Sequence, residues 1–255
     1  MRYEYKYIVH NSKMEQLRQM ILPFVDVDDF AEANGNNQYS VRSIYFDTPR
    51  YDFYFEKVEG IKNRKKVRLR GYDEEHADNI VFLEIKRKYS IPILKYRAPV
   101  TFSDAQIMFK EKNINGQVLF GDKFPKGLES SKRFFYQVFS KNLHPVVLIV
   151  YEREAYLSKF DSTVRITFDK NLRSKAYPTI NELYQEEKIK ATLSDHFILE
   201  VKFNRSFPGW LNPIISRFAL RKQSASKYVI SMDANNIVER LTKSNIYTRS
   251  QWFNS

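Results

Sequence analysis

The sequence predicts an α+β fold built around an antiparallel sheet, in one domain over residues 1–255. Seven segments rich in Val, Ile, Tyr, Phe and Thr alternate in polarity with the period of two that a β-strand requires. Helix-like segments lie between them without the regular strand–helix alternation of a parallel, doubly wound sheet. No linker, internal repeat or low-complexity stretch divides the chain. We expect about the last 20 residues to form a peripheral helix or tail.

The elements follow from local signals along the chain. Ser12 as N-cap and Pro23 as stop predict the first helix, in which apolar residues recur at helical spacing. Ser103 is a candidate cap for a second helix. A third helix, over 130–143, places four apolar side chains on one face. The predicted strands are 2–9, 40–47, 64–72, 80–88, 146–157, 163–169 and 197–203, and the predicted helices are 12–22, 103–112, 130–143, 209–220 and 224–241.

Composition narrows the class of protein. Lys and Arg number 42 against 30 Asp and Glu, a formal net charge of +12, and hydrophobic residues make up 43% of the chain. Such a chain can bury a core, and its charge indicates a polyanionic partner: nucleic acid, a phospholipid surface or phosphate compounds. The lack of Cys excludes disulfides, a thiol nucleophile and Cys-ligated metals. The longest apolar run, 146–151, is far too short for a membrane helix, and the N-terminus does not read as a signal peptide. We therefore expect a soluble, cytoplasmic protein.

The strands share an unusual ionic face. In 2–8, Glu4 and Lys6 lie on one face and three tyrosines on the other, and five more strands repeat this pattern. An ordinary sheet with one wet face explains any single strand. Six strands with the same ionic face favour a closed barrel with apolar residues outward under helices and charges lining the lumen. That lumen would contain seven bases (Lys6, Arg68, Arg70, Lys86, Arg153, Arg165, Lys202) and three acids (Glu4, Glu84, Glu200). The surplus of positive charge would suit a short phosphate chain bound with a divalent cation.

The same stretches resemble a known family. In family order, the matching pieces are 4–7 (EYKY), 43–48 (SIYFDT), 67–70 (VRLR), 84–86 (EIK), 151–156 (YEREAY), 164–169 (VRITFD), 199–202 (LEVK) and 226–228 (SKY). Together they resemble the VTC domain, the polyphosphate polymerase domain of the triphosphate tunnel metalloenzyme, or CYTH-like, superfamily. Arg2 replaces the first acid of the superfamily's opening pattern, and Ser224 replaces a family lysine. Because the regulatory domain and membrane helices of eukaryotic members are missing from the sequence, we expect a stand-alone, bacterial-type member.

The resemblance implies a closed, eight-stranded antiparallel tunnel with flanking helices. It also implies that Glu200 is the principal ligand of Mn²⁺ or Mg²⁺, with Glu4 and Glu84 as further carboxylates, and that Tyr151 and Ser226 donate hydrogen bonds to the substrate. The phosphate-contacting bases would be Lys6, Arg68, Arg70, Lys86, Arg153, Arg165, Lys202 and Lys227.

The function implied is metal-dependent phosphoryl transfer, with ATP or another triphosphate as donor and inorganic polyphosphate as acceptor. Hydrolysis of tripolyphosphate in the same tunnel, and polyphosphate binding without turnover, remain alternatives. Nucleic-acid binding is a third possibility that we do not expect, because the basic run 62–66 is typical of a solvated surface. The sequence contains no P-loop or Rossmann motif. His10, His76, His144 and His196 lack metal-ligand spacing.

Overall fold

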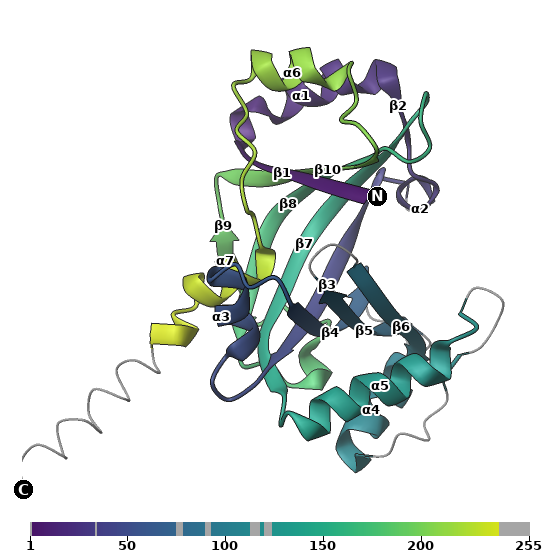
Figure 1. Ribbon diagram of the computed structural model, residues 1–255, viewed down its shortest axis with the longest axis vertical. Coiled ribbons are helices and arrows are strands. Elements are labelled where there is room, and N and C mark those ends of the chain that lie inside the picture. The colour runs from purple at the N-terminus through teal and green to yellow at the C-terminus, as the bar shows by residue number, and fades with distance from the viewer. Residues whose placement is uncertain are drawn as a thin grey trace, which may run out of the picture. The chain divides into compact units, whose positions relative to one another are not determined.

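The computed structural model describes residues 2–33, 35–74, 79–89, 93–112, 118–119 and 124–239 (Figure 1). His76 and the predicted C-terminal tail from residue 240 onward lie outside these residues. The chain divides into two compact units. Unit 1 contains Met1–Val41, Val150–Arg173 and Ala191–Ser226, and unit 2 contains Arg42–Ile149, Ser174–Lys190 and Lys227–Ser255. The single domain over 1–255 stays a prediction.

The described strands form an antiparallel sheet, which confirms the predicted α+β class. The strands are β1 (Arg2–His10), β2 (Val25–Val27), β3 (Gln38–Asp47), β4 (Arg64–Tyr72), β5 (Ile80–Lys88), β6 (Ile93–Thr101), β7 (His144–Ser158), β8 (Arg165–Ala176), β9 (Lys190–Leu193) and β10 (His196–Asn204). Their hydrogen-bonded order is β1-β10-β8-β7-β3-β4-β5-β6, with β2 beside β7 and β9 beside β8. Eight strands on the main path agree with the predicted number. In the described residues, however, this path is open, beginning at β1 and ending at β6, so its hydrogen bonds do not show the closed barrel.

The strands missed from the sequence are short or contain proline. Val25–Val27 and Lys190–Leu193 are too short to display an alternation. Pro99 lies within β6, and a proline inside an apolar run argues against a central strand because it lacks a backbone donor. The structure resolves the conflict by placing β6 at the end of the path, where Pro99 is opposite Phe82 of β5.

The five predicted helices occur with shifted ends, and two short helices, α2 (Asp29–Glu32) and α3 (Asp52–Val58), were not predicted. The predicted helices are α1 (Met14–Ile21), α4 (Phe102–Glu111), α5 (Gly127–Ser140), α6 (Leu211–Arg217) and α7 (Lys227–Ala234). Two of the predicted caps are wrong. Ser12 lies in a 3₁₀ turn (Asn11–Lys13) that precedes α1, and Thr101 replaces Ser103 as the cap of α4, because its extended backbone lets the hydroxyl accept the Asp104 N–H at 3.1 Å. Pro23 lies in the 3₁₀ turn Leu22–Phe24, directly after α1 ends.

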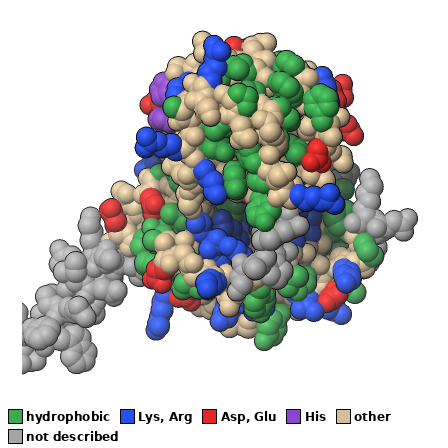
Figure 2. All heavy atoms as spheres, turned by 45° about the horizontal axis from the view of Figure 1, so that its top comes forward, with side chains coloured by type: hydrophobic (Ala, Val, Ile, Leu, Met, Phe, Trp, Pro, Cys, Tyr) green, Lys and Arg blue, Asp and Glu red, His purple; other side chains and the backbone are tan. Residues whose placement is uncertain are grey.

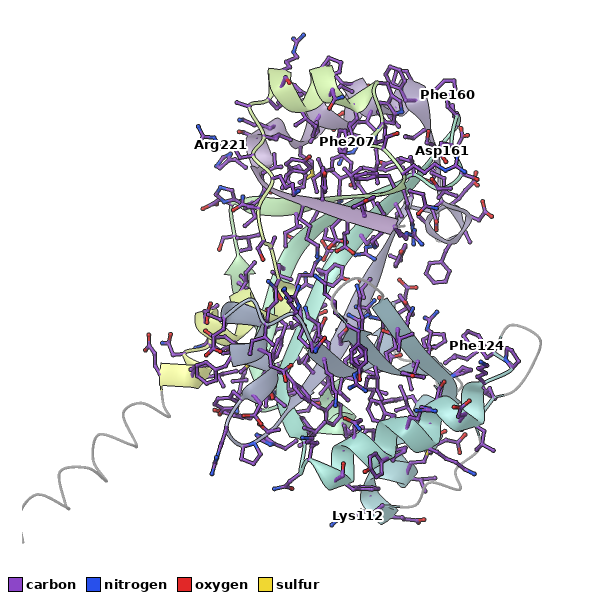
Figure 3. The ribbon with its side chains drawn as sticks, in the orientation of Figure 1. Lys112, Phe124, Phe160, Asp161, Phe207 and Arg221 are labelled. Carbon is purple, nitrogen blue, oxygen red and sulfur yellow. The ribbon has the colours of Figure 1, made fainter. Side chains whose placement is uncertain are left out.

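Unit 1 buries the apolar face of β1, β8 and β10 beneath α1 and α6 (Figure 1). Tyr7 of β1 is opposite Leu199 of β10, which in turn is opposite Phe168 of β8. Leu17 of α1 and Leu211 of α6 belong to the same core. Phe207, labelled in Figure 3, stacks on Tyr5 with ring centroids 5.5 Å apart. The predicted alternation is therefore confirmed here, since these strands place their apolar residues under the helices.

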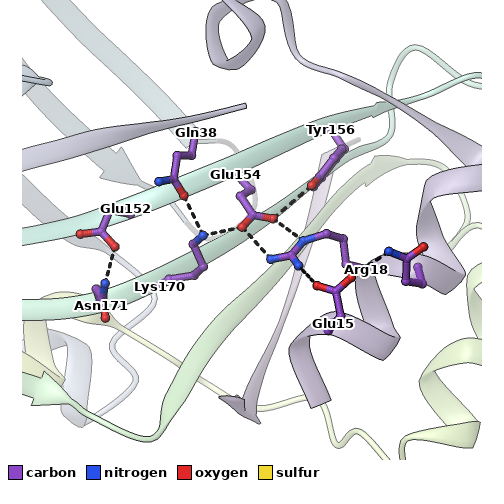
Figure 4. A network of polar contacts seen from close by, with 9 residues as sticks. Glu15, Arg18, Gln38, Glu152, Glu154, Tyr156, Lys170 and Asn171 are labelled. Atoms are coloured by element: carbon purple, nitrogen blue, oxygen red, sulfur yellow. Dashed lines mark hydrogen bonds and ion pairs between the residues drawn. The ribbon is translucent and has the colours of Figure 1, made fainter. Parts of the chain in front are cut away.

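The helix-covered face of β7 and β8 nevertheless contains an ionic network that the sequence analysis did not predict (Figure 4). Buried Glu154 accepts hydrogen bonds from Arg18 Nε at 2.9 Å and Arg18 Nη2 at 2.8 Å, and pairs with Lys170. Lys170 also donates to Gln38 Oε1 at 2.7 Å. Burial raises the pKa of Glu154, but the bonds from Arg18 and Lys170 outweigh it, and the pKa lies below its ordinary value. The network ties α1 to the sheet with compensated charges, so this face is not wholly apolar.

Unit 2 packs α4 and α5 against β5 and β6, with Phe134 and Phe135 of α5 fully buried. Asp47 ends β3 and accepts the backbone N–H groups of Phe53 and Tyr54 at the start of α3, both at 3.0 Å. The Tyr228 hydroxyl of α7 also donates to Asp47. Asp47 thus caps the start of α3 at the end of strand β3.

Candidate active site

Unit 1 places Glu200 among three bases on the face of the sheet away from α1 and α6. Glu200 is 4% exposed. Its Oε1 lies 2.9 Å from Lys6 Nζ, and its Oε2 lies 3.5 Å from Lys202 Nζ and 3.8 Å from Arg153 Nη2. Glu4 Oε1 lies 2.9 Å from the same Lys6 Nζ. The register explains the arrangement, because Lys6 is opposite Glu200 and Glu4 is opposite Lys202, so acids and bases alternate across β1 and β10.

The two lysines of this cluster differ in pKa. Burial by itself would lower the pKa of Lys6, but the carboxylates of Glu200 and Glu4 outweigh it and raise that pKa above its ordinary value. For Lys202 burial prevails: with Arg153 nearby and Glu200 only partly offsetting it, the pKa falls to about 8. Lys6 therefore has its counter-ions within the protein, whereas an added anion would stabilise the charge of Lys202.

Arg153 is held by an acid that the sequence analysis left without a role. Its Nε donates to Asp169 Oδ1 at 2.6 Å and its Nη2 to Asp169 Oδ2 at 2.8 Å. Asp169 is 1% exposed, and its carboxylate outweighs the effect of burial and raises the pKa of Arg153 well above its ordinary value. A two-bond contact of this kind fixes the plane of the guanidinium. Alternation along β8 could have identified Asp169, since it shares a face with Arg165.

Arg165 and Tyr151 complete the charged face of unit 1. Arg165 Nη2 lies 3.2 Å from Asp28 Oδ2 and donates to the Tyr39 hydroxyl at 3.2 Å. The Tyr151 ring is buried, with its centroid 5.3 Å from the Arg153 guanidinium carbon. Ser226, a predicted hydrogen-bond donor, is buried and is the last residue of unit 1 along the chain. Asp28 and Tyr39 lie outside the predicted strands, so alternation could not assign them to the charged face.

Unit 2 contains a second cluster, centred on Glu84 of β5, which is 2% exposed. Arg68 donates to Glu84 Oε2 from Nε at 2.7 Å and from Nη2 at 2.6 Å. Arg97 Nε and Lys95 Nζ lie 3.1 and 3.3 Å from Glu84 Oε1. Burial raises the pKa of Glu84, but the surrounding bases outweigh it and the pKa lies well below its ordinary value. Arg97 and Lys95 were missed because β6 was missed.

Tyr45 of β3 is another partner of Arg68. Its hydroxyl accepts from Arg68 Nη1 at 2.8 Å, and its ring stacks on Tyr228 with centroids 5.1 Å apart. Burial raises the pKa of this phenol, but Arg68, Lys66 and Arg70 outweigh it and lower the pKa to about 7. Arg70 donates to Ser43 Oγ at 3.1 Å. The remaining predicted bases of unit 2 are Lys86, opposite Lys66 and Lys95 in the register, and the buried Lys227, which begins α7.

Carboxylates in unit 1 fit the donor set of a hard divalent cation. The described residues contain no group of three or more His, Asp or Glu side chains suited to a metal. Mg²⁺ and similar ions, however, commonly use one or two carboxylates together with water and substrate phosphates. Glu4 and Glu200 meet that requirement because both lie 2.9 Å from Lys6 Nζ. Glu84, the third carboxylate predicted for the metal, is surrounded by Arg68, Lys95 and Arg97, much as Glu200 is surrounded by its own three bases.

The comparison with protein families matches the model of the VTC domain over residues 1–236. The chain belongs to the VTC domain family. This confirms the resemblance drawn from the strand motifs. The VTC domain is 28% identical over 262 residues to the vacuolar transporter chaperone complex subunit 4 of Schizosaccharomyces pombe. The match covers 83% of this chain but 34% of the relative, so the chain spans about a third of that protein's length.

Solved structures align with the chain at low identity. A candidate adenylate cyclase from Bacillus halodurans aligns with a TM-score of 0.51 and 11% identity, covering 89% of this VTC domain and 94% of that chain. The Hippeastrum protein HpAC1, described as an adenylyl cyclase candidate with a dominant triphosphatase activity, aligns with a TM-score of 0.48 and 12% identity, over 91% and 96% of the two chains. The first likeness shows that the VTC domain shares its antiparallel, sheet-rich α+β fold with that protein.

Basic side chains are also numerous on the surface shown in Figure 2, in keeping with the net charge of +12. Within the described part of the chain, no helix is both long enough and apolar enough to cross a membrane.

Proposed function

We propose that this VTC domain binds triphosphate and polyphosphate chains on its charged strand faces and transfers a phosphoryl group from ATP, or another nucleoside triphosphate, to a growing inorganic polyphosphate. The observation that carries the proposal is the cluster of Lys6, Arg153 and Lys202 around Glu200. Buried bases are costly unless anions compensate them. Glu4 and Glu200 compensate Lys6, and Asp169 compensates Arg153. The low pKa of Lys202, which Glu200 offsets only in part, indicates that the charge of Lys202 is incompletely compensated within the protein.

The residues divide into three roles. Arginine forks and lysine ammonium groups neutralise phosphate oxygens. Glu200, assisted by Glu4, holds Mn²⁺ or Mg²⁺, and that cation supplies charge neutralisation at the phosphates when it is bound. Asp169 and Glu84 orient Arg153 and Arg68. The phosphate-binding set is Lys6, Arg68, Arg70, Lys86, Arg153, Arg165, Lys202 and Lys227, with Tyr151 and Ser226 as hydrogen-bond donors. The closed eight-stranded tunnel implied by the resemblance is part of this proposal.

Phosphoryl transfer suits such a set of residues. The reaction asks mainly for positioning and for stabilisation of charge on the phosphate oxygens, and little covalent chemistry from the protein. A catalytic Ser, Cys or His nucleophile is therefore not required. Family membership supports the assignment to phosphate chemistry, and the acceptor of the phosphoryl group is the part that needs direct measurement.

The deciding experiment incubates the protein with ATP and Mn²⁺, or Mg²⁺ in parallel, and measures polyphosphate on stained gels together with free phosphate. Chain growth supports polyphosphate synthesis. Phosphate release without chain growth would identify a triphosphatase, and tight binding without either product would identify a binding module. Glu200→Gln is the test variant. Glu129→Gln is its matched control, because Glu129 pairs with Arg133 on the exposed surface of α5 at 2.7 Å.

A thermal-shift screen tests the nucleic-acid alternative. Tripolyphosphate with Mn²⁺ should raise the melting temperature strongly, because a ligand that binds only the folded state stabilises it. Single-stranded DNA and RNA should raise it less at the same concentration of phosphate. A larger rise with nucleic acid would contradict the proposal.

A further inference from the structure

Thr167 Oγ1 and Arg165 Nε, near the start of β8, are buried donors without a hydrogen-bond partner among the described residues. Thr167 is 1% exposed as a residue. Alternation fixes the side of the sheet on which both side chains lie, since their neighbours Ile166 and Phe168 belong to the helix-covered core. Both donors therefore lie on the charged face that carries Glu200.

The register places Thr167 at the centre of that face. Thr167 is opposite Glu200, and Arg165 is opposite Lys202. Side chains opposite each other in an antiparallel pair have Cβ atoms about 4.5–5.5 Å apart. The next acid along β8 on this side, Asp169, makes its two short bonds with Arg153 instead. The Thr167 hydroxyl thus lies among strongly charged groups without taking part in their hydrogen bonds.

Packing does not explain a hydroxyl at this position. Valine has nearly the same shape as threonine, is favoured in strands and would not bury a polar atom. A buried hydroxyl without a partner costs stability, and native proteins rarely contain one unless it has a functional role or a solvent partner. A hydroxyl that donates to an anion oxygen recovers this cost when the anion binds.

We propose that Thr167 is a ligand-binding residue whose hydroxyl donates a hydrogen bond to an oxygen of the phosphate chain, beside Arg165 and Lys202. This inference rests on the proposed function and adds a neutral donor to a set composed mainly of cations. Thr167 would orient the bound phosphate, because a hydroxyl donates its hydrogen bond along one axis. Lys202 supplies charge without fixing an orientation, because an ammonium group acts as a point charge. No bond is made or broken at Thr167.

The test compares three variants of the whole chain: Thr167→Val, Thr167→Ser and Ser131→Ala. Ser131 is the matched control, because its hydroxyl is also buried and without a partner among the described residues but lies on helix α5. Melting temperatures of the ligand-free proteins and the Kd of tripolyphosphate in chelator-treated, metal-free buffer are measured for each.

We expect Thr167→Val to melt at the same temperature as the parent protein or higher, and to bind tripolyphosphate about tenfold to a hundredfold more weakly, the loss of one charge-assisted hydrogen bond. Thr167→Ser should retain most of the affinity, and Ser131→Ala all of it. The opposite signs of the two effects of Thr167→Val distinguish a ligand-binding hydroxyl from a structural one, for which stability falls and affinity stays.

Unchanged affinity in Thr167→Val, or failure of that variant to fold, would overturn the inference. So would a loss of affinity that appears only when Mn²⁺ is present, because the hydroxyl would then act through the metal. If the parent protein itself does not bind tripolyphosphate with or without Mn²⁺, the proposed function fails and the inference fails with it. The parent's own titration thus separates the two failures.

Discussion

Replacing Glu200 with glutamine removes one negative charge from the centre of the unit 1 cluster while keeping the size of the side chain. Lys6 and Lys202 both lose an ionic partner, at 2.9 and 3.5 Å, and Arg153 loses one at 3.8 Å. The carboxylate is 4% exposed, so this change belongs with broken buried ion pairs and not with surface pairs, which contribute about 0–1 kcal/mol.

The magnitude follows from the distances. At an effective dielectric constant of about 20, unit charges 2.9 Å apart attract by about 6 kcal/mol. Part of this is retained, because Lys6 keeps Glu4 at 2.9 Å and the amide oxygen of glutamine still accepts a hydrogen bond. We therefore expect the free energy of unfolding of the ligand-free protein to fall by about 3 kcal/mol, the lower end of the range for breaking a buried pair. For a chain of this size that corresponds to a melting temperature roughly 6–12 °C lower.

The effect on the ligand should have the opposite sign. With one acid fewer among the bases, tripolyphosphate in metal-free buffer should bind Glu200→Gln as tightly as the parent protein or more tightly. The increase in affinity and turnover caused by Mn²⁺ should be lost, because the carboxylate that holds the ion is missing. Denaturation and isothermal titration with and without Mn²⁺ measure both effects, with Glu129→Gln as control.

Two results would refute this reasoning. A melting temperature within about 2 °C of the parent, which corresponds to less than about 1 kcal/mol, would show that Glu200 is not the counter-ion of the cluster. An unchanged Mn²⁺ requirement with near-parental activity would show that Glu200 does not hold the metal, and Glu4 would become the next candidate.

Four further predictions follow from other contacts. The pKa of Tyr45 is about 7 in the folded chain and near 10 in the unfolded chain, so the folded state binds fewer protons between pH 7 and pH 10. The free energy of unfolding should therefore rise over that range. Tyr45→Phe should flatten this part of the pH profile measured by urea denaturation, and an unaltered profile would contradict the prediction. Asp169→Asn should lower the free energy of unfolding by about 3 kcal/mol, since it strands the buried charge of Arg153, and tripolyphosphate should recover part of the loss in a thermal-shift assay; a loss below about 1 kcal/mol argues against the pair. Arg68→Ala should weaken tripolyphosphate binding by about 1.5–3 kcal/mol in calorimetry and stay folded, because Glu84 keeps Lys95 and Arg97 as partners. If the variant instead loses stability while its affinity for tripolyphosphate is unchanged, Arg68 is not a ligand-binding residue. Finally, tripolyphosphate affinity should fall less steeply with salt than the affinity for a single-stranded oligonucleotide, because buried charges are screened weakly; tighter oligonucleotide binding at both low and moderate salt would reverse the ranking.

The sequence by itself determined which side chains share a face. Side chains alternate along a strand with a period of two, so neighbouring residues alone assign each side chain to a face of the sheet. Lys6 lies on the face that Tyr5 and Tyr7 do not share, and Glu200 lies on the face that Leu199 and Val201 do not share. The structure confirms these faces, with the apolar residues in the core beneath α1 and α6. Composition likewise excluded thiol chemistry without any knowledge of the fold, and the strand motifs identified the family.

Strands interrupted by proline and helix caps were less accessible. Strand β6 was missed because Pro99 argues against a strand wherever its neighbours are unknown, and only the sheet order shows that it is the end strand of the path. The cap of α4 moved from Ser103 to Thr101 because capping depends on the backbone conformation of the residue as well as on its hydroxyl.

The tertiary structure alone decided which charges meet. Cross-strand register joins residues far apart in the chain, such as Lys6 with Glu200, and no local period encodes it. The geometry of side-chain hydrogen bonds then gave Asp169 to Arg153 and surrounded Glu84 with three bases, and it left the Thr167 hydroxyl without a partner in the described chain. A residue's face is a property of its own strand, whereas its partners are a property of the strands packed beside it.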